Sequence, residues 1–154
     1  MLLILECKPD EKLAMALGIA RKQIRHQNDK GQVCNFLKKS TGNIGLIDED
    51  PNSAQPKYLA NCTIISSQWN IKELSDRSGN IILIVSPRLE EWICQACLYS
   101  QIDLGKFGLP LDPKQLHKEV NHKLPKFGDL VTELLTSKSP HLVHLKNLLK
   151  QPAI

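Results

Sequence analysis

The sequence lacks the features that mark membrane and secreted proteins. It has no run of about 18 consecutive apolar residues, the length that a membrane span requires. The short apolar run at the N-terminus has no basic segment before it, which is unlike a signal peptide. The five cysteines are odd in number, and their spacings fit neither a secreted disulfide framework nor a four-ligand zinc site. We therefore expect a cytoplasmic protein with reduced thiols and no membrane contact.

Several well-known catalytic motifs are also missing. The chain has no serine nucleophile elbow, no phosphate-binding P-loop and no glycine fingerprint for a dinucleotide, so no motif supports a serine hydrolase, an NTPase or a dehydrogenase. The hydrophobic share of 42% and the charged share of 23% are ordinary for globular proteins and argue against disorder and collagen-like repeats. With 154 residues, the chain matches the size of one ordinary domain.

The net charge of +4 is unevenly distributed along the chain. Residues 1–103 carry 12 Lys or Arg and 12 Asp or Glu, whereas residues 104–154 carry 8 Lys and 4 acids. All of the excess positive charge therefore lies in the last third. Such a lysine-rich segment attracts phosphates without reading sequence, although solvated lysines on helix surfaces give the same pattern.

Apolar runs alternate with helical patterns over the first two thirds of the chain. Continuous apolar runs, typical of strands buried on both faces, occupy residues 2–6, closed by Glu6, residues 44–47, and residues 80–85, which begin with Asn80. Residues 60–65 form a weaker run. Helical spacing predicts helices over 10–25, 33–37 and 89–102, while residues 66–79 show no clear period. This alternation predicts a Rossmann-like α/β fold with a mostly parallel sheet and helices on both faces.

The last third of the chain has only helical patterns. Leucine-rich periodicity predicts helices over 112–123, 128–136 and 140–149. We therefore divide a single domain of residues 1–154 into an α/β core, 1–102, and a helical C-terminal extension, 103–154.

Three acids follow the apolar runs at positions where function is expected. Glu6 ends the first run, and Asp48 and Asp50 follow the second. In open parallel sheets the functional crevice lies beyond the carboxyl ends of the strands, so neighbouring strands would bring these carboxylates together. Carboxylates this close together repel one another. A hard divalent cation, Mg²⁺ or Mn²⁺, is their natural counter-ion. In extended backbone, Asp48 and Asp50 would point the same way, toward one ion.

These residues resemble the two signature motifs of Toprim domains. The run Leu-Leu-Ile-Leu-Glu6 entering a helix, followed by apolar residues 44–47 and Asp48-Glu49-Asp50, is similar to the motifs of topoisomerases, primases, small nucleases and the OLD-type nucleases. The resemblance covers roughly residues 1–102. It implies a catalytic Glu6 serving as acid or base, an Asp48 and Asp50 pair binding Mg²⁺, and phosphodiester chemistry on nucleic acid. Cys7 stands where a glycine commonly follows the motif glutamate.

The resemblance also implies a site for a second metal. OLD-type nucleases hold a second ion with acids from a downstream position, which Glu90 matches here. A first-turn acid that stabilises the helix dipole is the alternative for Glu90. Trp69, in an irregular polar segment, is either buried or exposed to stack on a base.

Three functional hypotheses follow. The first is a metal-dependent phosphodiester enzyme, most simply a nuclease acting on DNA or RNA, with the lysine-rich extension positioning nucleic acid. The second is a catalytically degenerate Toprim-like module that binds nucleic acid or a partner protein, as in a defence or toxin–antitoxin assembly, with a homodimer among the possible assemblies. The third makes Asp48 a phosphoacceptor like that of receiver domains, although the first strand ends in one acid instead of two.

Overall fold

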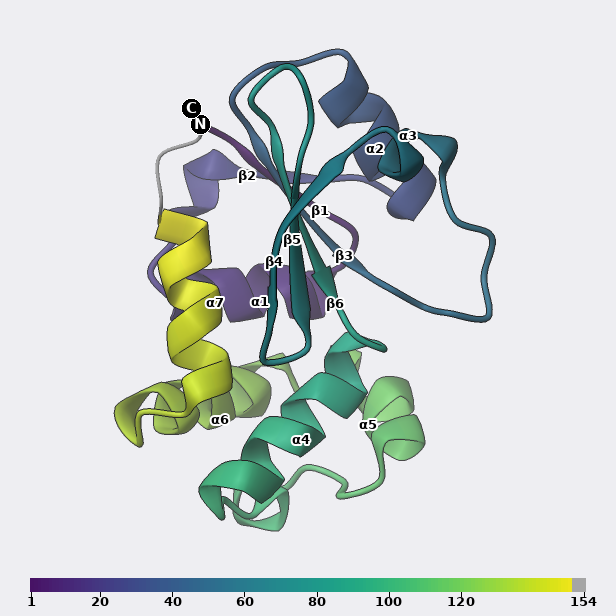
Figure 1. Cartoon of the computed structure of the whole chain (residues 1–154). Helices are drawn as coiled ribbons and strands as arrows, with labels where there is room; N and C mark the ends of the chain where they lie inside the picture. The colour runs from purple at the N-terminus through teal and green to yellow at the C-terminus, as the bar shows by residue number, and fades with distance from the viewer. Residues whose placement is uncertain (151–154) are drawn as a thin grey trace.

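A six-stranded mixed sheet forms the centre of the computed structural model, which describes residues 1–150 (Figure 1). The strands are β1 Leu3–Leu5, β2 Ile24–His26, β3 Ile44–Asp48, β4 Thr63–Gln68, β5 Ile71–Ser75 and β6 Ile81–Val85, in the spatial order β2-β1-β3-β6-β5-β4. The four strands β2, β1, β3 and β6 are parallel, and β5 and β4 add antiparallel strands at one edge. The expected α/β fold with a mostly parallel sheet is confirmed, and its architecture is consistent with a Rossmann-like arrangement.

Helices cover both faces of the sheet, as predicted. On one face, α2 Lys30–Lys38 and α3 Lys57–Ala60 pack on alternate strand residues that include Ile4, Ile47 and Ile82. Gly45 allows α2 to approach closely, since a Cβ atom there would lie 2.6 Å from Leu37 Cδ1. The strand pattern thus places one set of side chains under α2 and leaves the other set for the opposite face.

The opposite face carries the larger core. Leu3, Leu5, Leu46 and Leu83 point into a cluster shared by α1 Lys8–Ala16, α4 Leu89–Ser100 and the helices that follow α4. Trp92 of α4 is fully buried in this cluster. Two helical layers therefore fix the sheet, and its carboxyl edge lies where β1, β3 and β6 end.

The predicted helix over residues 10–25 is wrong in its second half. The helix α1 stops at Ala16, and Gly18 then adopts a φ of +96°, a left-handed conformation that L side chains rarely adopt. The chain continues through a short 3₁₀ turn, Arg21–Gln23, into β2, which pairs with β1 at the end of the sheet order. With three residues and a single buried side chain, β2 is too short to show a strand period.

The segment between β3 and β6 also differs from the prediction. Of the strand expected over 60–65, residues 63–65 do lie in a strand, β4, whereas Ala60 ends the short helix α3. The apparently irregular stretch 66–79 contains the end of β4 and all of β5. Trp69 and Asn70, both with positive φ, form the two-residue turn that joins β4 to β5. Because β4 is an exposed edge strand, its side chains lack the apolar alternation that reveals a strand in the sequence.

The part of the chain after residue 103 is helical, as expected. It contains the 3₁₀ turns Leu104–Phe107 and Val120–His122 and the helices α5 Pro113–Glu119, α6 Leu124–Thr136 and α7 Pro140–Lys150. The last four residues of the predicted extension, 151–154, lie outside the described residues. Leucines of α6 and α7 enter the same core as β1 and α1, so these helices complete one face of the sheet. None of the helices within residues 1–150 has the length and apolar character needed to span a membrane.

Candidate functional site

The carboxyl ends of β1 and β3 bring Glu6 and Asp48 together. The two strands are hydrogen-bonded neighbours in parallel register, with Leu5 opposite Leu46. Glu6 follows β1, and its carboxylate accepts a hydrogen bond of 3.1 Å from the Asp48 backbone N–H. The Asp48 carboxylate in turn accepts a hydrogen bond from the backbone N–H of Leu89, at the start of α4. Three parallel strands therefore deliver their ends to one acidic edge.

Asp50 lies at the same edge but not in the predicted extended backbone. Its φ is +43°, so the strand conformation ends before it and the expected alternation of side chains does not continue. The Asp50 carboxylate forms an ion pair of 3.3 Å with Arg88, which precedes α4. Glu49, between the two aspartates, pairs with Lys72 of β5 at 3.1 Å. The predicted extended backbone at Asp50 is therefore wrong, although Asp48 and Asp50 both line the same cavity.

A fourth acid, Asp10, lies in the first turn of α1. It is 3% exposed and its carboxylate accepts a hydrogen bond of 3.2 Å from the Cys7 thiol. Burial, followed by repulsion from Glu6 and Glu90, raises the pKa of Asp10. Burial, followed by repulsion from Asp10, Glu6 and Glu90, likewise raises the pKa of Asp48. Glu6 and Glu90 therefore lie close enough to Asp10 and Asp48 to oppose the ionisation of these two carboxyl groups.

Glu90 is held by a histidine from the helical extension. Its side chain is buried in the first turn of α4, and its carboxylate lies 2.9 Å from Nδ1 of His117 on α5. The His117 side chain is 66% exposed, so the pair joins a buried acid to an accessible imidazole. The helical extension therefore contributes a titratable group directly to this edge.

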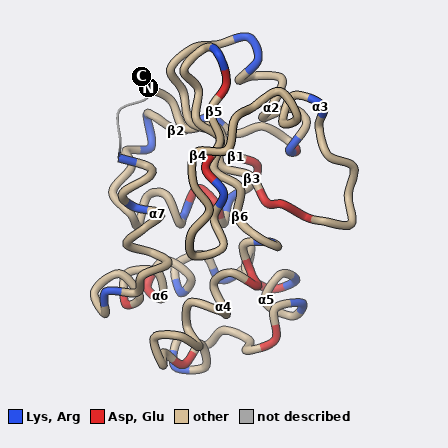
Figure 2. Tube along the Cα trace, viewed as in Figure 1, with Lys and Arg blue, Asp and Glu red and all other residues tan. Residues whose placement is uncertain are grey.

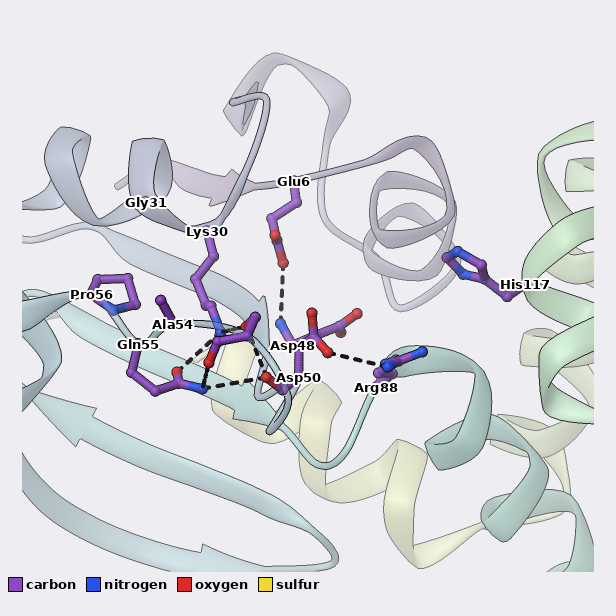
Figure 3. A pocket seen from close by; sticks show the side chains of 11 residues that line it. Glu6, Lys30, Gly31, Asp48, Asp50, Ala54, Gln55, Pro56, Arg88 and His117 are labelled. Atoms are coloured by element: carbon purple, nitrogen blue, oxygen red, sulfur yellow. Dashed lines mark hydrogen bonds and ion pairs between the residues drawn. The ribbon is translucent and has the colours of Figure 1, made fainter.

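A cavity of about 570 Å³ opens beside these residues (Figure 3). Its wall combines the strand ends with the loop after β3 and the start of α2; the lining residues are Glu6, Lys30, Gly31, Asp48, Asp50, Ser53, Ala54, Gln55, Pro56, Arg88 and His117. Lys30 is only 8% exposed, and its ammonium group donates to Glu49 O, Ser53 Oγ and Gln55 Oε1 at 2.8–3.1 Å. Lys30 therefore holds in place the loop that carries Asp50. Arg88 is the cation at the site that could leave its ion pair to bind a phosphate.

The carboxylates at this edge have the chemistry that suits a hard divalent cation, but their present arrangement does not form a binding site. Carboxylate oxygens are the ligands that Mg²⁺ and Mn²⁺ prefer, and a cation would offset the burial and the repulsion that raise the pKa of Asp48 and Asp10. Within residues 1–150, however, no group of three or more His, Cys, Asp or Glu side chains is arranged so that it could hold a metal ion. Metal binding would therefore require Asp50 or Glu90 to exchange its present partner for the ion.

The lysines of the extension are not gathered at this edge. Figure 2 shows basic residues on each of α5, α6 and α7, and acidic residues concentrated along the chain after β3. The excess positive charge of the last third is thus spread over several helices.

Comparison of the chain with protein-family models, curated proteins and solved structures returns no match.

Sequence reasoning found Glu6, Asp48, Asp50 and Glu90 because each follows an apolar run. It missed the roles of Asp10, Lys30 and His117, which depend on contacts between elements distant in sequence. For Asp10, the signal available was its position four residues after Glu6, within the first turn of α1. Nothing local distinguishes Lys30 or His117 from the other lysines and histidines of the chain.

Proposed function

We propose that this protein is a Toprim-like, metal-dependent phosphodiester enzyme, most simply a nuclease acting on DNA or RNA. The observation that supports the proposal is the meeting of Glu6, Asp48 and Asp50 at the carboxyl ends of adjacent strands, beside a cavity of about 570 Å³. The crevice beyond the carboxyl edge is where open parallel sheets bind ligands. The resemblance of residues 1–102 to Toprim motifs adds support that is independent of this geometry.

The residues of the edge have distinct roles in this proposal. Asp48 and Asp50 would hold Mg²⁺ or Mn²⁺, with Glu90 as an additional ligand, and the bound ion would polarise the phosphate and lower the pKa of a bound water. Glu6, whose pKa is raised by burial, is suited to hold or move a proton near the cavity. Arg88 would leave Asp50 to bind a phosphate oxygen, since a guanidinium matches phosphate geometry.

Asp48→Asn tests the proposal because it removes one negative charge while preserving the shape of the side chain. Labelled single- and double-stranded DNA and RNA are incubated with Mg²⁺ or Mn²⁺, and cleavage is followed on denaturing gels. We expect cleavage by the wild type, its loss in Asp48→Asn, and unchanged unfolding cooperativity. Asp129→Asn is the matched control, because Asp129 is exposed on α6, away from the carboxyl edge. Equal cleavage by the wild type and Asp48→Asn would contradict the proposal.

The arrangement of the acids favours a second candidate. Asp50 and Glu90 are already engaged by Arg88 and His117, and the acids of residues 1–150 do not form a ready ion site. These contacts suit a catalytically degenerate module that binds nucleic acid or a partner protein without cutting. Nucleic-acid binding that persists in EDTA, with no cleavage under any metal, would select this candidate.

A further inference from the structure

A second cavity of about 570 Å³ lies beside the β4–β5 hairpin tip and is unlike the acidic one. Its lining residues are Trp69, Asn70, Gln95, Leu98, Tyr99 and His141, none of which is acidic or a lysine or arginine. They come from the hairpin turn, from α4 and from the start of α7, which are far apart in sequence (Figure 1). The surface is mainly apolar with a few polar groups, which is the usual composition of a small-ligand site.

Three aromatic rings meet in this cavity. The Trp69 ring centroid lies 5.4 Å from that of Tyr99 and 5.2 Å from that of His141, and Tyr99 and His141 are 5.8 Å apart. Trp69 remains 38% exposed and Tyr99 61% exposed, although large aromatic surfaces are normally buried. The rings therefore form a cluster that leaves accessible faces on which another flat ring could stack.

The fold holds Trp69 in place by contacts of its backbone. Its φ of +53° is a left-handed conformation that is unusual for so large a side chain. The Trp69 carbonyl accepts a hydrogen bond of 2.8 Å from the indole N–H of Trp92, which is fully buried in α4. This hydrogen bond anchors the Trp69 backbone to α4, while its indole stays 38% exposed.

The polar groups of the cavity are neutral and suit the edge of a heteroaromatic ring. Asn70 Nδ2 donates to Gln95 Oε1 at 2.7 Å, which leaves the side-chain Oδ1 of Asn70 and the Gln95 amide N–H₂ to face a ligand. His141 is 5% exposed, and within residues 1–150 its Nδ1 makes no hydrogen bond. A nucleobase has both flat faces and an edge of donors and acceptors, whereas a phenylalanine side chain has only the faces.

We infer that this aromatic cavity binds an unpaired nucleobase of a nucleic-acid strand. The inference rests on the proposed function, because the strand whose base enters the cavity is the one whose phosphodiester lies at the acidic edge. The two cavities are linked by the chain itself: Ser86 N–H donates to Asn70 O at 2.9 Å, and Arg88, two residues later, lines the acidic cavity. One strand passing over residues 86–88 would reach both.

Tryptophan fluorescence in EDTA tests the inference without cleavage. The full chain is titrated with a short single-stranded oligonucleotide and with an abasic oligomer of the same length, which carries the same phosphates. We expect saturable quenching with the base-bearing strand, and roughly tenfold or greater loss of affinity for the abasic one, as for a base stacked on aromatic side chains. Trp69→Leu should remove the quenching, because the remaining Trp92 is fully buried.

Tyr99→Ala is the second variant, in case Trp69→Leu disturbs the hairpin, and should weaken binding of the base-bearing strand measured by anisotropy. Ile64→Ala is the matched control, since Ile64 is 65% exposed on β4 but does not line the cavity.

Equal affinity for both oligomers, or no binding of either, would overturn the inference. Quenching by N-acetyl-phenylalaninamide but not by the base-bearing strand would also overturn it and assign a protein partner. Cleavage with base-indifferent binding would overturn only the inference, and base-dependent binding without cleavage would overturn only the proposed nuclease.

Discussion

Lys30 is a cation whose charge is used inside the protein. Its three hydrogen bonds to the loop after β3 satisfy all three ammonium donors, so a phosphate would find none of them free. The loop they fasten carries Asp50, whose left-handed backbone the strand itself does not impose. Although Lys30 lines the cavity, as a phosphate ligand would, it is thus better described as a positioning residue.

Lys30→Met keeps an unbranched apolar side chain that is one atom shorter, and it removes all three hydrogen bonds. Because Glu49 O and its neighbours would lose a charged donor, we expect the free energy of unfolding to fall by about 1–3 kcal/mol. For a domain of this size that corresponds to roughly 2–4 °C in Tm per kcal/mol, which thermal unfolding by circular dichroism will measure. Lys118→Met, an exposed lysine on α5, is the control and should change Tm little. Equal Tm values for the two variants would show that the loop does not depend on Lys30.

The elements that sequence patterns predicted well are those with many buried residues. The strands β1, β3 and β6 are nearly fully buried, and continuous apolar runs reveal them together with the acids that follow. In contrast, β2 has one buried residue and β4 has none, so neither carries a period that differs from a loop. The same reason explains why Glu6 and Asp48 were found while Asp10 and His117 were not: their roles arise from packing between helices and strands.

Gly45 tests how α2 packs on the sheet. In Gly45→Ala the new Cβ would lie 2.6 Å from Leu37 Cδ1 and 3.3 Å from Val33 Cγ1, so either the Leu37 side chain or α2 itself must shift. We expect a loss of about 1–3 kcal/mol in unfolding free energy, the usual result of overpacking a core. Urea denaturation followed by circular dichroism provides the measurement.

Leu37→Val supplies the matching background, because it removes the methyl group that meets the new Cβ. The cost of Gly45→Ala should then be smaller in the Leu37→Val protein than in the wild type, which a double-mutant cycle resolves. An identical cost in both backgrounds would place the strain of Gly45→Ala elsewhere than at the α2–β3 contact.

Opposite pKa shifts at the two ends of the sheet should govern the pH dependence of the whole molecule. Burial alone would raise the pKa of Asp76, but hydrogen bonds from Tyr58, Asn80 and Ser78 outweigh burial and lower it. The folded state therefore binds this proton more weakly than the unfolded chain, and the stability Asp76 contributes is lost as the pH falls below about 4. At the carboxyl edge the signs reverse, because the pKa values of Asp10 and Asp48 are raised to about 7 and about 9.

Without divalent cations, we expect Tm to be highest near pH 5, to fall toward pH 3 and to fall again toward pH 8. Between the unfolded pKa of about 4 and their folded values, Asp10 and Asp48 bind more protons in the folded state, so stability decreases as the pH rises. Asp48→Asn should lift the alkaline limb by about 2–4 °C at pH 8, for relief on the order of 1 kcal/mol, and leave the acidic limb unchanged. Asp76→Asn should flatten only the acidic limb, so each variant controls for the other in one set of unfolding scans. An alkaline limb that Asp48→Asn leaves in place would mean that neither burial nor repulsion penalises the ionised Asp48 carboxylate, and the reason to expect a cation there would disappear.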